Sequence, residues 1–336
     1  MAVLAAIPAL VAAPSSAQQT HLLVVAGIGG GAAYTERFLE WGTALRSAAI
    51  ERYGVPAEQA VLLSEDPEMS EAATGESRRD DVEAHLAALA GRVQPADRVL
   101  VVLIGHGSFR DGQASFNLPG PDLSAAEWKA LLDALPTERV ALVNTASASG
   151  PFATELSAPG RVVITATASG NERNETRFGQ YFAAAWVDGE ADLDKNGSTS
   201  LLEAFQYARR ETERFYSDEN RLLTEHAMLE DDGDGEGTRE PTLDTPDGAV
   251  AATFTLGLPG ARAAVTAEGA PSPIPATSDT VLVRLYGERA DLEARVAELR
   301  RMQGSLDPDT YEQELEALLV ELALKNREIR AREGGE

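Results

Sequence analysis

The sequence predicts an α/β protein in which helices cover both faces of a parallel sheet. Between about residues 20 and 187, short apolar runs alternate with longer amphipathic stretches. The apolar runs are rich in Val and Leu without polar alternation, which is typical of strands buried on both faces. The regular succession of strand and helix indicates a parallel sheet, because parallel neighbours need a long crossover that is usually helical.

Five buried strands are expected from the apolar runs, at residues 22–26, 60–63, 98–104, 140–143 and 162–165. Four helices are expected from the amphipathic stretches, at residues 35–53, 79–93, 125–135 and 175–187. Gly54 closes the first helix, since glycine commonly follows the last helical turn. Ser124 opens the third helix, since its hydroxyl can accept a hydrogen bond from an unpaired N–H of the first turn.

The second half of the chain has a different composition. Residues 188–237 are strongly acidic and include an expected helix at 200–216, and residues 249–256 could form an edge strand. Residues 264–280 are rich in Gly, Pro, Ser and Thr, which is typical of a flexible linker. Two apolar stripes predict a C-terminal α-helical hairpin: Leu292, Val296 and Leu299, then Tyr311, Leu315, Leu318 and Leu322.

These patterns divide the chain into a signal peptide (1–17), an α/β domain (18–257), a linker (258–280) and the helical hairpin (281–336). Residues 2–13 form an apolar run of 12 residues, which is shorter than the roughly 20 residues that a membrane-spanning helix needs. Small residues at Ser15 and Ala17 stand where signal peptidase cleaves. We therefore expect export, either into the periplasm or out of the cell. The alternative for this segment is a disordered, Ala-rich tail.

Composition argues against several classes of function. The chain carries 54 acidic and 29 basic residues, a formal charge of −25, which repels nucleic acid and anionic membrane surfaces. It contains no cysteine, so disulfides, thiolate metal sites and a cysteine nucleophile are excluded.

Two neighbouring strand ends carry the residues best suited to chemistry. The strand 98–104 runs into Gly105-His106-Gly107-Ser108, and the strand 140–143 runs into the small-residue segment 144–150. Ligand sites of open parallel sheets form at the carboxyl ends of the strands. A histidine flanked by glycines beside a hydroxyl could therefore form a base and nucleophile pair. The alternative is a pair of tight turns that use small residues.

Five segments together resemble the legumain peptidases of the caspase-like fold. Residues 101–108 read Val-Val-Leu-Ile-Gly-His-Gly-Ser, residues 117–122 read Asn-Leu-Pro-Gly-Pro-Asp, and residues 146–150 read Ala-Ser-Ala-Ser-Gly. Residues 53–59 and 176–179 fit the same pattern. The resemblance spans about residues 20 to 190. It implies a caspase/legumain-like parallel-sheet sandwich that takes a peptide or protein as its substrate or ligand.

The same resemblance assigns roles to three residues. His106 matches the catalytic histidine of the family, and Gly107 matches the residue whose backbone N–H helps to hold the oxyanion. The nucleophile motif of the family is Ala-Cys-any-Ser-Gly, so Ser147 stands where the cysteine belongs. The family also tends to carry an Asn after the first strand to orient the histidine, and Gly29 occupies that place.

Replacement of the thiol by a hydroxyl predicts impaired catalysis. A thiol with a pKa of about 8.5 is partly ionised near neutral pH and intrinsically nucleophilic. A serine hydroxyl needs a base that a third group holds in orientation, and the sequence shows no such group. We expect a natural pseudo-peptidase with a binding or scaffold role. An engineered cysteine-to-serine variant and a serine-type hydrolase that uses Ser147 and His106 stay open.

Residues 192–203, Asp-Leu-Asp-Lys-Asn-Gly-Ser-Thr-Ser-Leu-Leu-Glu, fill the template of an EF-hand calcium loop. The template takes side-chain oxygens at positions 1, 3, 5 and 9, a backbone carbonyl at position 7 and a bidentate carboxylate at position 12. Gly197 stands at position 6, where the loop turns sharply. The expected Ca²⁺ ligands are Asp192, Asp194, Asn196, Ser198, Ser200 and Glu203. The alternative is an acidic loop that only caps the following helix.

A second acidic run, residues 231–237, reads Asp-Asp-Gly-Asp-Gly-Glu-Gly. It could add ligands for the same or another cation, but it lacks the terminal glutamate, so a solvated surface loop is expected. His21, His85 and His226 have no partners at metal-ligand spacing and are expected to be structural or exposed.

Overall fold

The computed structural model describes residues 18–187, 189–257 and 308–333, together with residues 285, 292, 295, 296 and 299. The expected signal peptide, the linker 258–280 and most of the first hairpin helix lie outside the described residues. Within them, no helix is long and apolar enough to cross a membrane.

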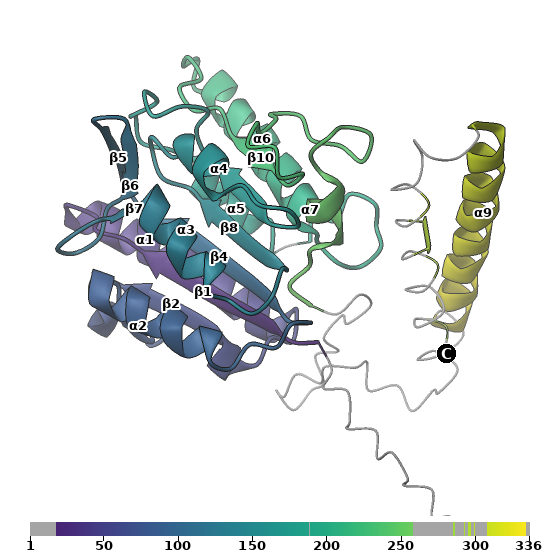
Figure 1. Ribbon diagram of the computed structural model, residues 1–336, viewed down its shortest axis with the longest axis horizontal. Coiled ribbons are helices and arrows are strands. Elements are labelled where there is room, and N and C mark those ends of the chain that lie inside the picture. Colours follow the sequence, from purple (N-terminus) through teal and green to yellow (C-terminus); the bar gives the residue numbers. More distant parts are fainter. Residues whose placement is uncertain are drawn as a thin grey trace, which may run out of the picture.

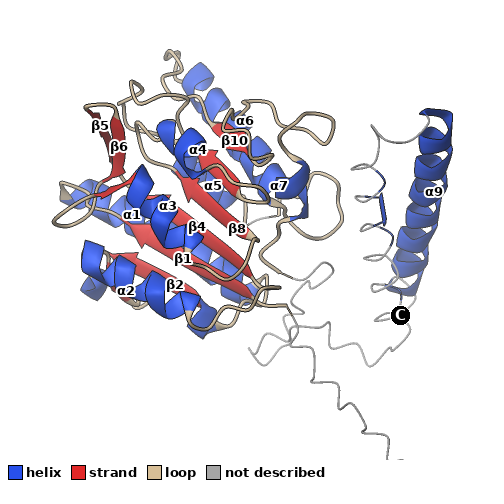
Figure 2. Ribbon diagram, in the orientation of Figure 1, coloured by secondary structure: helices blue, strands red, loops and turns tan. Residues whose placement is uncertain are grey.

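A seven-stranded sheet forms the centre of the α/β part, in the order β10-β9-β8-β4-β1-β2-β3 (Figures 1 and 2). Its strands are β1 (Thr20–Ala26), β2 (Ala60–Ser64), β3 (Gly75–Glu76), β4 (Arg98–Ile104), β8 (Val140–Asn144), β9 (Val162–Thr165) and β10 (Met228–Glu230). All neighbours pair in parallel except β9 and β10, which are antiparallel. The predicted α/β class with a mostly parallel sheet is therefore confirmed.

Helices cover both faces of this sheet (Figure 2). The helices α1 (Ala32–Glu51), α5 (Phe178–Ala184), α6 (Leu201–Asp218) and α7 (Ala249–Thr253) supply the core on one face. The helices α2 (Arg79–Ala90), α3 (Ala125–Asp133) and α4 (Pro151–Leu156) supply the core on the other. Two short 3₁₀ turns, Ala57–Gln59 and Pro67–Met69, flank β2. The chain is thus a three-layer sandwich.

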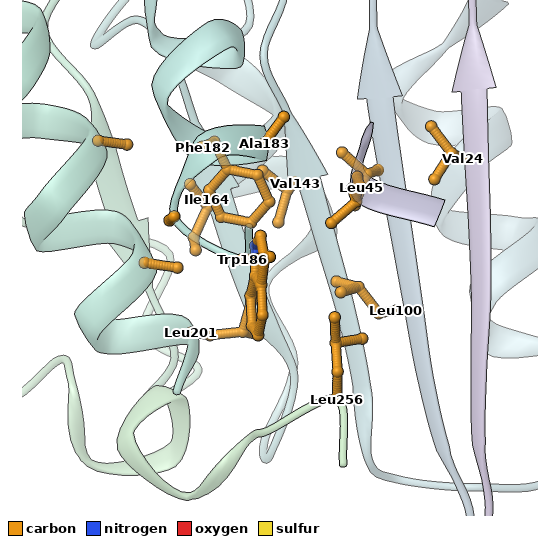
Figure 3. Packing of buried hydrophobic residues seen from close by; sticks show 14 of the residues in the cluster. Val24, Leu45, Leu100, Val143, Ile164, Phe182, Ala183, Trp186, Leu201 and Leu256 are labelled. Atoms are coloured by element: carbon orange, nitrogen blue, oxygen red, sulfur yellow. The ribbon is translucent and has the colours of Figure 1, made fainter. Parts of the chain in front are cut away.

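The two cores follow from the alternation of side chains along buried strands. Leu22 and Val24 of β1 belong to one cluster, whereas Leu23 and Val25 belong to the other. Figure 3 shows the first cluster, in which Trp186 lies among residues from the sheet and from several helices. Burying one such large apolar side chain contributes about 1.5–3 kcal/mol, so strands that are apolar on both faces stabilise both layers of helices.

The predicted elements agree with the structure for most of the sheet, and one assignment is wrong. The strands expected at 98–104 and 162–165 have those bounds, and Ser124 forms a capping box with Glu127 at the start of α3. The expected edge strand at 249–256 is instead the short helix α7. The buried Asp231 carboxylate explains this difference, because it accepts hydrogen bonds from the N–H groups of Gly248 (2.8 Å) and Ala251 (2.7 Å) and so caps a helix start.

Two further elements differ from the expectation. The helix expected at 175–187 begins only at Phe178, where the buried Glu225 carboxylate accepts the N–H of Phe178 (3.0 Å). A separate antiparallel sheet, β5 (Gly107–Arg110), β6 (Gln113–Phe116) and β7 (Leu123–Ser124), was not expected. Asp111 and Gly112 connect β5 to β6 with φ values of 52° and 81°. This Asp-Gly pair is a characteristic two-residue hairpin turn.

The C-terminal helix α9 spans Pro308–Glu333, and the chain enters it at the expected proline. The two apolar stripes of the expected hairpin pack against each other rather than standing alone. Their buried cluster consists of Leu292, Val296, Leu299, Tyr311 and Leu318, with Leu315 and Leu322 at its border. Because the apolar stripes of the hairpin are buried against each other, the hairpin is not needed to cover the α/β core.

Removal of the hairpin is therefore expected to leave the α/β part stable. Among the described residues, the two core clusters of the sandwich contain none beyond Leu256, so a chain that ends at residue 264 should melt at the temperature of the full chain. Differential scanning calorimetry measures this, with a chain ending at residue 333 as the control. Aggregation or a much lower melting temperature of the short chain would show that the hairpin covers the core.

Candidate functional site

Three loops meet where the strand order of the sheet reverses. The segment 27–31 follows β1, His106 follows β4 and Ser147 follows β8. These strands are parallel neighbours, with Ala26 opposite Ile104 and Leu103 opposite Asn144. Their carboxyl ends therefore lie at one edge, and the reversal between β1 and β4 is where open α/β sheets bind ligands. The structure brings the two expected strand ends together.

Ser147 contacts the backbone of Gly107. The Ser147 hydroxyl lies 3.4 Å from the Gly107 N–H and donates to the Gly107 carbonyl at 3.3 Å. Ser147 is only 6% exposed. A side chain at position 107 would collide with the Ser147 carbonyl oxygen, so only glycine allows the two loops to approach so closely.

His106 lies between two aromatic rings of α1. Its imidazole makes edge-on contacts with Tyr34, at 4.8 Å between ring centres, and with Phe38, at 5.1 Å. The backbone of Gly29 also favours the protonated form of the ring. The sequence shows no side chain that would orient this imidazole, and the structure holds it between the two aromatic rings of α1.

The Gly29 loop is itself held by an acidic side chain. Glu65, just after β2, accepts the Gly29 N–H at 2.6 Å and the Thr35 hydroxyl at 2.7 Å. A Cβ at position 29 would lie 2.5 Å from the Thr35 nitrogen. An Asn at this position would not fit without movement of the loop.

Burial controls the charge of His106. It lowers the pKa of His106 below 6.5 by more than the Gly29 hydrogen bond and the charge of Glu175 raise it. Glu175 is itself bound to the Tyr34 hydroxyl (3.1 Å), to Arg37 and to Arg177 (3.5 Å). The imidazole is therefore neutral at pH 7 and can act as a base or a hydrogen-bond acceptor.

The proton path from Ser147 to His106 is not formed. In the described part of the chain, the hydrogen-bond partners of the Ser147 hydroxyl are the two backbone atoms of Gly107 and not the imidazole. A base must be within about 2.6–3.2 Å of the proton that it takes, or one water molecule away. Catalysis by this pair requires the Ser147 hydroxyl to leave Gly107 first.

The turn that carries Ser147 is strained and firmly held. Ala148 has a φ of 57°, in the left-handed region that non-glycine residues rarely adopt, and its N–H donates to the Glu172 carbonyl at 2.7 Å. The Glu172 carboxylate in turn binds the backbone N–H and Nδ1 of His226, both at 3.0 Å. His226 is therefore part of the support of the turn. A cavity of about 310 Å³ lies beside it, between α6 and residues 223–227, and its walls contain neither His106 nor Ser147.

The EF-hand-like loop brings three of its six expected ligand residues into one cluster. The carboxylates of Asp192, Asp194 and Glu203 offer oxygens that all lie within 4.8 Å of one another. Asp192 accepts the N–H groups of Asn196 and Gly197, both at 3.0 Å. The loop turns through Lys195 (φ 60°) and Gly197 (φ 87°). The residues present therefore fit a hard cation that takes oxygen ligands.

Glu203 has two roles in this loop. Its carboxylate accepts the Leu193 N–H at 2.9 Å and the Ser200 N–H at 2.8 Å, and with Ser200 it forms the capping box of α6. Burial, followed by the negative charge of Glu203, raises the pKa of Asp194 to about 6. These carboxylates repel one another, and a bound divalent cation would remove that repulsion. The side chains of Ser198 and Ser200 add no charge to the cluster.

Comparison with known proteins adds no identification. No model of a protein family matches the chain, and no curated protein matches it. The function therefore has to be inferred from the geometry.

The pKa of His106 is the first quantity to test at this site. Titration of the ring signals by NMR should place the pKa of His106 below 6.5, because burial disfavours the charged imidazole. Between these two pKa values the unfolded chain binds more protons at His106 than the folded chain does. The contribution of His106 should therefore lower the free energy of unfolding as the pH falls from about 6.5 through the folded-state pKa. His106→Gln should remove this part of the pH dependence. A folded-state pKa of His106 at or above 6.5 would contradict the description.

Proposed function

We propose that the chain is an exported, calcium-binding protein of legumain/caspase-like fold whose peptidase site is catalytically impaired and binds peptide segments. The observation that carries this proposal is the hydrogen bonding of Ser147 to the Gly107 backbone. A hydroxyl that is weakly nucleophilic and has no base in contact does not attack a peptide bond at an appreciable rate. Such a site can bind a peptide without cleaving it.

Recognition of a peptide is supported by the surroundings of Gly107. The Gly107 N–H makes only a long contact of 3.4 Å to Ser147, so it can donate to a peptide carbonyl in its place. β5, which begins at Gly107, is the edge strand of its sheet, and extended peptides bind by adding to such edges. Arg37, Arg177 and Glu175 contribute both signs of charge nearby.

A serine-type hydrolase is the second candidate, and a different observation favours it. His106 is held between the rings of Tyr34 and Phe38 and has a lowered pKa, and a neutral, fixed imidazole is suited to act as a general base. This candidate requires the Ser147 hydroxyl to turn from Gly107 to the imidazole when a substrate binds. An engineered cysteine-to-serine substitution would give the same geometry.

A partner protein is proposed for the C-terminal hairpin. Leu319, Val320 and Leu324 of α9 are 41%, 52% and 53% exposed, although the facing stripe of the same helix is buried against Leu292, Val296 and Leu299. Val320 and Leu324 are four residues apart and so share one exposed side of the helix, and exposed apolar residues on one side of a helix are typical of contact with another protein. The hairpin would then be the scaffold element of the protein.

Labelling with a fluorophosphonate probe distinguishes the catalytically impaired site from an active serine hydrolase. The impaired site predicts no labelling of the wild-type chain, the same result as for Ser147→Ala. Ser147→Cys should become reactive to thiol reagents, because the oxyanion contact at Gly107 is present. Ser217→Ala, at an exposed position of α6, serves as the control. Labelling of the wild-type chain that is lost only in Ser147→Ala would establish the serine hydrolase instead.

Calcium should raise the melting temperature through the loop 192–203. A ligand that binds only the native chain adds about 2.7 kcal/mol at one hundred times its Kd. Glu203→Gln should remove most of this gain, while a glutamine at this position can still complete the capping box. Glu213→Gln, on the exposed side of the same helix, should keep the gain. Equal melting temperatures of the wild-type chain in calcium and in EDTA would rule the site out.

A further inference from the structure

Glu230, the last residue of β10, has one carboxylate oxygen without a partner. Its Oε1 accepts hydrogen bonds from the Ser157 hydroxyl (2.9 Å) and from the N–H groups of Gly233 (2.8 Å) and Gly235 (3.3 Å). Its Oε2 is buried and has no hydrogen-bond partner among the described residues, and Glu230 is 0% exposed. Burying a carboxylate oxygen without a partner is unfavourable, so such oxygens commonly coordinate a cation.

Two further carboxylates converge on Glu230. Asp232 and Asp234 each offer an oxygen, and together with that of Glu230 these oxygens all lie within 4.8 Å of one another. Asp232 and Asp234 are exposed. Within the described ranges, no Lys or Arg forms an ion pair with any of the three. Three negative groups thus share one small volume without a counter-charge among the described residues.

The segment that starts at Glu230 repeats the first half of the loop 192–203 in its spacing. Oxygen-bearing side chains stand at positions 1, 3 and 5 of both segments, and glycine stands at position 6. The backbone is left-handed at positions 4 and 6 of both. The φ values are 60° at Lys195 and 87° at Gly197, and 87° at Gly233 and 82° at Gly235.

The hydrogen bonds inside the two segments also correspond. The residue at position 1 accepts the N–H of position 6: Gly197 donates to Asp192, and Gly235 donates to Glu230. The residue at position 3 accepts the N–H of position 5 in both cases, and the residue at position 5 accepts the N–H of position 7. The same fold of backbone around carboxylates therefore occurs twice, although the two sequences share little beyond their spacing.

We propose that Glu230, Asp232 and Asp234 bind a second calcium ion, with the backbone carbonyl of Glu236 at the seventh position of the loop. The ligands are all oxygens and include no histidine or cysteine, which favours Ca²⁺ over transition metals. The buried Oε2 of Glu230, which has no hydrogen-bond partner among the described residues, is the feature that separates this site from an ordinary acidic turn.

The second site differs from the first in its place in the fold and in the way the end of its loop is held. Glu230 pairs with Val163 near the start of β9, so the ion lies at the amino edge of the parallel strands, opposite the edge that carries His106 and Ser147. In place of a twelfth-position carboxylate, the loop is closed by backbone hydrogen bonds between Leu229 and Thr238, at 2.9 and 2.8 Å. Without that bidentate ligand we expect weak binding, with a Kd of about 10⁻⁴–10⁻³ M.

Calcium stoichiometry of the full-length chain tests this site separately from the loop 192–203. Equilibrium dialysis against Ca²⁺ at several millimolar should give one bound ion fewer per chain for Asp232→Asn/Asp234→Asn than for the wild type. The matched control, Asp218→Asn/Asp244→Asn, changes two exposed acidic residues outside both loops and should bind as the wild type does. Glu203→Gln should retain the weaker ion.

Each outcome has a defined meaning. Loss of one ion in Asp232→Asn/Asp234→Asn but not in the control supports the second site, even where Glu203→Gln shows that the first loop binds nothing. The same stoichiometry and affinity in Asp232→Asn/Asp234→Asn and in the wild type would overturn it. Because Asp232 and Asp234 are exposed, these substitutions leave the buried Glu230 and its three hydrogen bonds in place, and circular dichroism checks that the variant is folded.

Discussion

Strand β4 is paired with β1 along seven residues and with β8 along five, and this pairing organises the rest of the molecule. Because both neighbours are parallel to β4, their connections have to cross the sheet, and the crossovers place helices on both faces. Every residue of β4 is buried. This register also places the carboxyl ends of β1, β4 and β8 beside one another. The segments that contain Gly29, His106 and Ser147 follow these ends and therefore meet at one edge of the sheet.

Much of this fold could be predicted because its strands are buried on both sides. A continuous apolar run such as residues 99–104 has no polar side chains that would mark an exposed face, so the strand is clear in the sequence. The segment 249–256 was misassigned because its conformation depends on Asp231, which lies outside it and caps α7 through buried hydrogen bonds. Contacts of this kind, between residues that are distant in the sequence, produce no local pattern from which they could be predicted.

The site could be predicted in its residues but not in its hydrogen bonds. The glycines beside His106 and the small residues around Ser147 mark the two loops, and strand adjacency brings them together. The contacts that hold His106 come from the rings of Tyr34 and Phe38, and contacts between such distant positions have no sequence signature. Similarly, spacing identified the loop 192–203, whereas the importance of Glu230 arises from its burial at the end of β10, which only the packed structure reveals.

The Ser147 hydroxyl rests on the Gly107 backbone, whereas the His106 imidazole is held between the rings of Tyr34 and Phe38 and does not contact that hydroxyl by a hydrogen bond among the described residues. This arrangement places a hydroxyl and an imidazole at the same edge of the sheet without the hydrogen bond that would activate the hydroxyl as a nucleophile. A crystal structure of the wild-type chain that resolves side-chain rotamers tests it most directly. We predict that the Ser147 hydroxyl lies within hydrogen-bond distance of the Gly107 backbone and outside that distance from both His106 ring nitrogens. A hydrogen bond from the Ser147 hydroxyl to the imidazole would contradict the account.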